Sequence, residues 1–189
     1  MDLNAFSHGQ IQSKLWLCEE LEKHISNPVK IIILGCWYNV LGFMLLVRNS
    51  QLYQNICGVD YNNESIALAN KISNAWNMNQ PSDKIKNLCL DVNDIEFNNY
   101  DVIISTSVED IQDMNWYNSI PKNKLVCLQC NNLTPEQVST YDNWDILNPI
   151  TSLDIFKEKC PMNQILFEGE KIFDYGTLKY SRYMLIGYK

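Results

Sequence analysis

Residues 29–39 read VKIIILGCWYN and carry the strongest fold signal of the sequence. After Lys30 the run is wholly apolar up to Gly35, which predicts a strand buried on both faces that ends in a glycine turn. Residues 40–47 continue as an apolar helical run around Gly42, and residues 56–59 form a second apolar strand that ends at Asp60. Strand, turn, helix and strand in this order indicate a β-α-β unit.

A β-α-β unit of this kind places a turn of free backbone N–H groups at the carboxyl edge of a parallel sheet. It also places the Asp60 carboxylate at the tip of the next strand, where it can accept hydrogen bonds from two ribose hydroxyls. The stretch therefore predicts a site for a nucleoside-containing cofactor. The alternative is that Asp60 is a solvent-exposed acid at a strand end with no ligand.

The remaining chain alternates between helical and strand patterns. Helical spacing predicts a leading helix over residues 10–25 and others over residues 63–77, near Trp116, from Pro135 and over residues 153–160. Further strands are predicted at residues 85–90, 100–105, 124–129, 165–173 and 180–188. This order predicts an α/β fold: a doubly wound, mostly parallel seven-stranded sheet with a C-terminal antiparallel hairpin. We expect one domain over residues 1–189, with residues 1–28 as a leading helical segment.

Composition narrows the class of partner. The chain has 189 residues, is 46% hydrophobic and carries a formal charge of −7, which disfavours duplex nucleic acid as a partner. The apolar run 31–47 is shorter than a membrane-spanning helix requires, and the N-terminus lacks the pattern of a signal peptide. The seven cysteines are scattered, so we expect reduced thiols and a cytoplasmic protein.

Cys127 and Cys130 form the one CxxC pattern of the sequence. A zinc site would need two further ligands, and no second CxxC or paired histidine supplies them. Within a strand the two thiols would point to opposite faces, which favours packing in the core. No metal is expected.

The order of these features resembles that of class I S-adenosylmethionine-dependent methyltransferases. More specifically, the segments Gly35–Tyr38, Thr106–Ile111 and Tyr183–Gly187 resemble small methyltransferase-like proteins of marine phages and bacteria. The family's first motif places an acid two residues before a Gly-x-Gly-x-Gly turn. Here Ile33 replaces the acid, and only Gly35 remains of the three glycines. Trp37 and Asn39 take the other two places, and asparagine tolerates a left-handed backbone better than most residues.

The resemblance implies S-adenosylmethionine as cofactor and a set of residues that would bind it: Gly35, Cys36, Trp37, Asp60, Tyr61, Asp91, Val92 and Thr106. In this reading Asp60 binds the ribose diol and Tyr61 lines the adenine. Asp91 accepts from the adenine amino group, and the Val92 N–H meets a ring nitrogen. The alternative for Asp91 is a side chain that caps a turn.

The loop 105–110 faces the transferred methyl group in the family and carries the catalytic candidates. Glu109 could bind a cationic amine or take its proton, and Ser107 could hydrogen-bond the substrate. The alternative is a polar loop that caps the next helix. Gln10, Ser13 and Lys14 share one face of the leading helix, which either covers the active site or is simply solvated.

These features favour a methyltransferase that acts on an unknown acceptor, either a small molecule or a protein. One alternative is a non-catalytic domain that binds a cofactor or nucleotide, which the eroded glycine motif favours. A second alternative is an NAD(P)-dependent reductase. The missing GxGxxG motif and the predicted C-terminal hairpin both count against a reductase.

Overall fold

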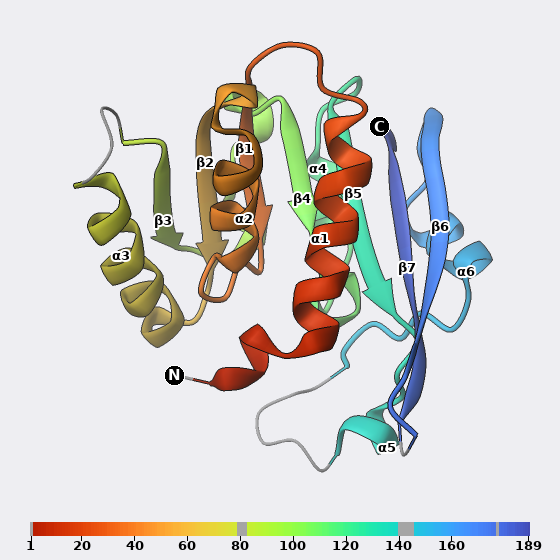
Figure 1. The fold of residues 1–189 in the computed structure, drawn as a ribbon. Coiled ribbons are helices and arrows are strands. Elements are labelled where there is room, and N and C mark those ends of the chain that lie inside the picture. Colours follow the sequence, from red (N-terminus) through yellow and green to blue (C-terminus); the bar gives the residue numbers. More distant parts are fainter. Residues whose placement is uncertain (1, 79–82, 140–145, 177) are drawn as a thin grey trace.

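The computed structural model describes residues 2–78, 83–139, 146–176 and 178–189. Its centre is a seven-stranded sheet with the strand order β3-β2-β1-β4-β5-β7-β6 (Figure 1). The strands are β1 (Val29–Leu34), β2 (Tyr53–Asp60), β3 (Ile85–Cys89), β4 (Val102–Ser105), β5 (Leu125–Asn131), β6 (Gln164–Asp174) and β7 (Lys179–Tyr188). The α-helices are α1 (His8–Glu22), α2 (Val40–Asn49), α3 (Asn63–Asn77), α4 (Asn115–Ser119), α5 (Pro135–Val138) and α6 (Leu153–Lys159).

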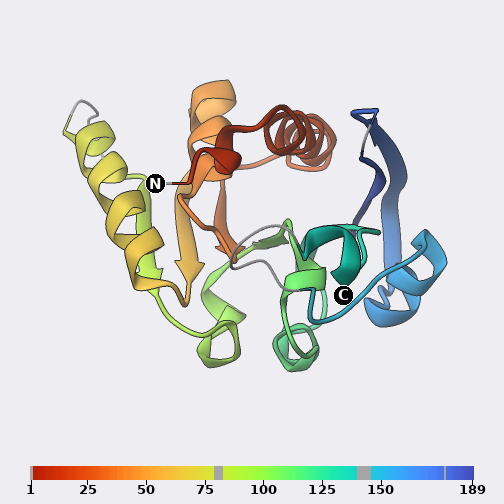
Figure 2. The same ribbon diagram turned by 90° about the horizontal axis from the view of Figure 1, so that it is seen from below.

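The strand directions confirm the predicted fold class. Strands β1 to β5 pair in parallel, and β7 lies antiparallel between β5 and β6. The arrowheads of β1 to β5 therefore meet at one edge of the sheet, at the bottom of Figure 1, and Figure 2 views the molecule from that side. Open α/β sheets bind ligands outside this carboxyl edge.

Helices cover both faces of the sheet, which explains why the central strands lack polar alternation. Ile31 and Ile33 of β1 pack on the face that α1, α2 and α3 cover. Ile32 and Leu34 point to the opposite face, where they pack with residues of α4, α6 and the short 3-10 helix η4 (Phe97–Asn99). A run of four consecutive buried residues in β1 follows directly from this double cover.

Element boundaries shift modestly from the sequence prediction. The leading helix begins at His8, after a 3-10 helix η1 (Leu3–Phe6), and ends at Glu22 rather than at residue 25. Strand β2 begins three residues before the predicted start because Tyr53 is fully buried and belongs to the core. The predicted start of α5 is confirmed, with Thr134 as its N-cap in a capping box.

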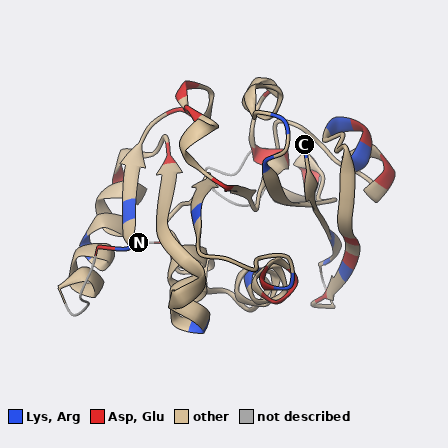
Figure 3. Cartoon of the chain, turned by 90° about the horizontal axis from the view of Figure 1, so that it is seen from above, with Lys and Arg blue, Asp and Glu red and all other residues tan. Residues whose placement is uncertain are grey.

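The surface carries charges of both signs. Figure 3 shows Lys and Arg dispersed over several elements, and α6 carries both signs along its short length. None of the described helices is long and apolar enough to cross a membrane. All seven cysteines are free, and six of them are buried.

Candidate functional site

The turn between β1 and α2 keeps a left-handed backbone at the three positions where the family motif has glycine. The φ angles are 59° at Gly35, 52° at Trp37 and 54° at Asn39. A non-glycine residue pays roughly 1–2 kcal/mol for this conformation. Asn39 offsets part of this cost because it is the N-cap of α2, and its side chain accepts from the Gly42 N–H. The shape of the motif is therefore retained without its glycines.

Trp37 has no such local compensation. Its ring packs against the Tyr38 ring at a centroid separation of 5.1 Å, and its backbone N–H donates to Asp60 Oδ2 at 2.8 Å. The aspartate thus holds Trp37 in the conformation that glycine would adopt freely.

The expectation of a turn of free N–H groups is wrong for three of its residues. The Cys36 N–H donates to the Val59 carbonyl, and the Asn39 N–H donates to the Cys36 carbonyl. The Trp37 N–H is taken by Asp60. These backbone N–H groups find acceptors within the protein because the turn packs against Val59 and Asp60 at the end of β2 and folds back on Cys36.

Asp60 is buried, with 9% of its surface exposed, so the reading of a solvated strand-end acid is wrong. Its Oδ2 accepts from Trp37 and its Oδ1 accepts from the Asn62 N–H at 2.9 Å. The carboxylate therefore joins the β1–α2 turn to the segment that enters α3. Each carboxylate oxygen can accept about two hydrogen bonds, so each retains one acceptor position.

The strand-end residues on β2 and β3 come together as predicted from the parallel pairing. Asp60 is the register partner of Cys89, and its carbonyl accepts from the Leu90 N–H, so Asp91 follows close by. Asp91 is exposed and caps the 3-10 helix η3 (Val92–Asp94) by accepting from the Asn93 N–H, as the alternative reading expected. Tyr61, which follows Asp60 directly, is 81% exposed.

The loop after β4 reaches the glycine turn. A Cβ atom placed on Gly35 would lie 3.5 Å from Ser107 Oγ, so these two segments are in contact distance. The Thr106 carbonyl accepts from Arg182 Nη1 of β7 at 2.8 Å. Ser107 therefore lies beside the turn, whereas Thr106 connects the loop to the other half of the sheet.

Glu109 is fully buried within the 3-10 helix η5 (Val108–Asp110). Its Oε1 accepts two hydrogen bonds from Asn131, one from the backbone N–H at 3.2 Å and one from the side-chain amide. Its Oε2 is buried and has no partner among the described residues. Burial, and then the nearby Asp110, raise the pKa of Glu109 well above its ordinary value.

The face of α1 formed by Gln10, Ser13 and Lys14 is not a solvated surface. Ser13 is fully buried and donates to Gln129 Oε1 at 2.9 Å, while Gln129 donates back to the Ser13 carbonyl. Lys14 is 8% exposed, and burial, then Arg182, lower its pKa to about 7. The solvated interpretation is therefore wrong for Ser13 and Lys14, and the interpretation that this face covers the active site stays a prediction.

Sequence reasoning missed two buried polar groups. Arg182 is 4% exposed and lies on the face of β7 that also carries Met184. An arginine in the otherwise uncharged run 180–188 was the signal available for it. The second is a chain in which Asn39 donates to Asn87 and Asn87 donates to Ser73 and Asn70. This series of hydrogen bonds connects Asn39 in the turn to α3 through Asn87 of β3, and no local sequence pattern predicts it.

The thiols of Cys127 and Cys130 point to opposite faces of the sheet, as predicted, since Cys127 packs with the α1 side and Cys130 with the α4 side. Within the described residues no group of three or more His, Cys, Asp and Glu side chains is placed to hold a metal ion.

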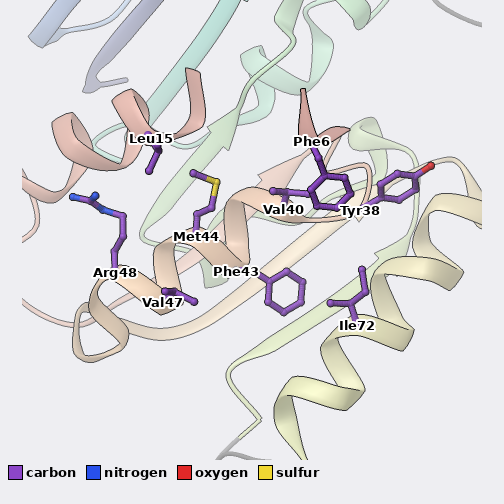
Figure 4. A pocket seen from close by; sticks show the side chains of 9 residues that line it. All are labelled: Phe6, Leu15, Tyr38, Val40, Phe43, Met44, Val47, Arg48 and Ile72. Carbon is purple, nitrogen blue, oxygen red and sulfur yellow. The ribbon is translucent and has the colours of Figure 1, made fainter. Parts of the chain in front are cut away.

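A surface cavity of about 380 Å³ lies elsewhere, between α1, α2 and α3 (Figure 4). Its lining is almost wholly apolar: Phe6, Leu15, Tyr38, Val40, Phe43, Met44, Val47, Arg48 and Ile72. None of the predicted site residues lines it. The strand-end groups and this cavity are therefore separate features.

Neither a family model nor a curated protein matches the sequence. Solved structures do match the fold. A putative sarcosine dimethylglycine methyltransferase from Galdieria sulphuraria has a TM-score of 0.69 at 12% identity, covering 95% of this chain and 86% of that one. Coclaurine N-methyltransferase, solved with N-methylheliamine and SAH, has a TM-score of 0.68 at 12% identity, covering 95% of this chain and 72% of that one.

The [4+2]-cyclase SpnF also matches, with a TM-score of 0.66 at 11% identity, covering 92% of this chain and 80% of that one. Identities this low establish the fold alone. The chain has the same seven-stranded fold as these enzymes, and the presence of a cyclase among them means that the fold does not by itself specify the reaction.

Proposed function

We propose that the protein is an S-adenosylmethionine-dependent methyltransferase whose acceptor is a small molecule or a protein. The observation that carries this proposal is the left-handed backbone at positions 35, 37 and 39, held against Asp60 at the end of the next strand. The left-handed backbone at Trp37 is costly, and a turn shape that is retained at such a cost supports a ligand-binding role.

The residues at the edge fit the cofactor. Asp60 retains one acceptor position on each carboxylate oxygen, which suits the two ribose hydroxyls. Tyr61 offers an exposed ring for adenine, and Asp91 and Val92 follow at the next strand end. Bound there, the cofactor supplies a sulfonium methyl group and thus the difficult chemistry. The chain's own task is to align the acceptor and exclude water.

A non-catalytic cofactor-binding domain is the second candidate. The specific observation in its favour is that the amides of Cys36, Trp37 and Asn39 are already satisfied within the protein. A reductase is less well supported, because the antiparallel β6–β7 hairpin is not usual for nicotinamide-binding domains.

Calorimetry with S-adenosylmethionine, its demethylated product and NAD tests the cofactor assignment. We expect saturable binding of both adenosyl ligands and none of NAD. A tritiated-methyl screen over pooled metabolites and proteins then separates the two candidates, since a binding domain would hold the cofactor without transferring label. Binding of NAD alone would contradict the methyltransferase proposal.

A further inference from the structure

Four side chains form a buried group beneath α1 that the cofactor assignment does not use. We call Lys14, Glu109, Asn131 and Arg182 the α1–β7 polar cluster. All are strongly buried, with exposures of 8%, 0%, 1% and 4%. Charged residues are seldom buried to this extent unless they are paired.

The strand register places the cluster on one face of the sheet. Asn131 of β5 is the direct partner of Arg182 of β7, so both side chains point to the same side. Gln129, two residues before Asn131, bonds to Ser13 of α1. The cluster therefore lies on the α1 face, at the end of β5, and the partly exposed Gln10 and Thr106 flank it.

The two cations of the cluster have neutral partners. Lys14 Nζ donates to Gln10 Oε1 at 2.5 Å, and Arg182 Nη1 donates to the Thr106 carbonyl at 2.8 Å. Within the described residues neither forms an ion pair, and Arg182 Nε has no hydrogen-bond partner. Arg182 is therefore a buried positive charge without an ion pair in the described part of the chain, and protonation of Lys14 adds a second one. Buried charges of one sign are unfavourable for folding unless an anion accompanies them.

Glu109 does not supply that anion. Because Oε1 already accepts two N–H groups from Asn131, a proton on this carboxyl belongs on Oε2, which is buried and unpartnered. The raised pKa of Glu109 favours the protonated form. Its Oε2–H is then a third donor beside the two cations.

We propose that the α1–β7 polar cluster binds the carboxylate of a small methyl acceptor. This rests on the proposed function, and it names the substrate class. The guanidinium fork of Arg182 suits the two oxygens of a carboxylate, and Lys14 adds a second positive charge. The same charges repel a cationic amine, so the amine-binding role predicted for Glu109 does not fit this environment.

The cluster adjoins the cofactor turn. Arg182 holds the carbonyl of Thr106, and the next residue, Ser107, reaches to within 3.5 Å of the Cβ position of Gly35. A carboxylic acid held by Arg182 and Lys14 would thus extend toward the turn on which we place the cofactor.

NMR titration of the cofactor-free protein with acetate, propionate and benzoate, each matched by its amide, tests the proposal. We expect the carboxylates to shift resonances of α1 and β7 and the amides not to. Lys14→Met and Arg182→Met should each weaken carboxylate binding at least about tenfold, because each removes a charge-assisted contact. Lys71→Met, at an exposed position on α3, is the matched control and should change nothing.

Lys14→Met removes a buried charge that has no ion pair among the described residues, so we expect its melting temperature in buffer to be no lower than that of the natural protein, and a clear fall would indicate a structural role instead. Arg182→Met also loses the bond to the Thr106 carbonyl, so its carboxylate affinity is compared at a temperature where the variant is folded. Equal response to carboxylates and amides, or unchanged affinity in both variants, overturns the proposal. Tighter binding of inorganic phosphate than of any carboxylate would overturn the substrate class.

Proton uptake gives an independent readout. The charges that act on the pKa of Lys14 are those of Arg182 on β7 and Cys18 on α1. Arg182 in turn interacts with Glu109 and Tyr180, and Glu109 interacts with Asp110. Its pKa of about 7 means that carboxylate binding at pH 8 should draw a proton onto Lys14. Calorimetry in two buffers of different ionisation enthalpy measures this uptake, which Lys14→Met should abolish.

The same proteins are also titrated with S-adenosylmethionine. If the adenosyl ligand binds and carboxylates do not, this inference fails alone. If carboxylates bind and no adenosyl ligand does, the cluster stands as an anion site and the proposed function fails.

Discussion

Replacing Asp60 by alanine should destabilise the protein even in the absence of any ligand. In the natural protein the backbone N–H groups of Trp37 and Asn62 donate to the Asp60 carboxylate at 2.8 and 2.9 Å, and Asp60 is 9% exposed. The substitution leaves both N–H groups without this acceptor. A hydrogen bond to a charged group contributes roughly 1.5–3 kcal/mol, so the two together are worth about 3–6 kcal/mol. Water entering at the partly open edge favours the lower end of this range, about 3 kcal/mol.

A loss of about 3 kcal/mol corresponds to a fall in melting temperature of roughly 6–12 °C for a chain of this size. Equilibrium urea unfolding without ligand measures the free energy directly. Asp60→Asn should lose about half as much, because its carbonyl oxygen serves one N–H while its amide nitrogen faces the other. Asp91→Ala is the control: Asp91 is exposed and caps a single N–H, so at most about 1 kcal/mol is expected.

An Asp60→Ala protein within about 0.5 kcal/mol of the natural one would refute this reasoning, because the two amides would then have found other partners. Asp60→Ala should also bind S-adenosylmethionine at least about tenfold more weakly than the natural protein if Asp60 accepts the ribose hydroxyls. Reduced stability with unchanged affinity would leave Asp60 as a purely structural residue and remove the ribose assignment.

Three further changes test other parts of the structure. Gly58→Ala should lower the free energy of unfolding in urea by about 1–3 kcal/mol, because a Cβ atom there would lie 2.6 Å from Asn39 Nδ2. Unchanged stability would show that the buried side chain of Asn39 moves aside at no cost. The pKa of Lys14 falls from 10.5 to about 7 on folding, so between these pH values the folded state binds fewer protons than the unfolded state. The free energy of unfolding should therefore rise between pH 7 and 10, by up to about 1.4 kcal/mol per pH unit. Lys14→Met should flatten that rise. Glu109 should change stability with pH in the opposite direction. Its raised pKa means that above pH 4.5 the folded state binds one proton more than the unfolded state, so the free energy of unfolding should fall as pH rises from there. Glu109→Gln, which mimics the neutral acid, should remove that fall, and a variant with the same pH profile as the natural protein would contradict a neutral Glu109.

The order and type of the sheet's elements could be predicted from the amino-acid pattern alone. Each central strand is a short, continuous apolar run, and α2, α3, α5 and α6 each begin at a residue whose side chain caps the helix, so local patterns were sufficient for these elements. The strand Val29–Leu34 was predicted at its observed bounds for this reason. The C-terminal hairpin also followed, because residues 165–173 and 180–188 alternate.

The candidate site was only partly accessible from sequence. Asp60, Asp91 and Ser107 follow strand ends, and parallel strands bring their carboxyl ends to one edge, so their proximity was predictable. Asn39 was expected to keep the turn left-handed, and it does. That Trp37 does the same was not foreseeable, because it depends on the bond that its N–H donates to Asp60.

The burial of the polar groups and the identity of their partners depend on contacts that form only in the folded protein. Lys14 looked like part of a solvated helix face until α1 was placed over β5 and β7, where Arg182 lies within range of its charge. Asn131 and Arg182 are far apart in the chain and meet only through the antiparallel register. Burial and pairing are properties of contacts between distant segments, whereas propensity and periodicity are properties of neighbours, which is why the fold could be predicted from the sequence and the charge arrangement beneath α1 could not.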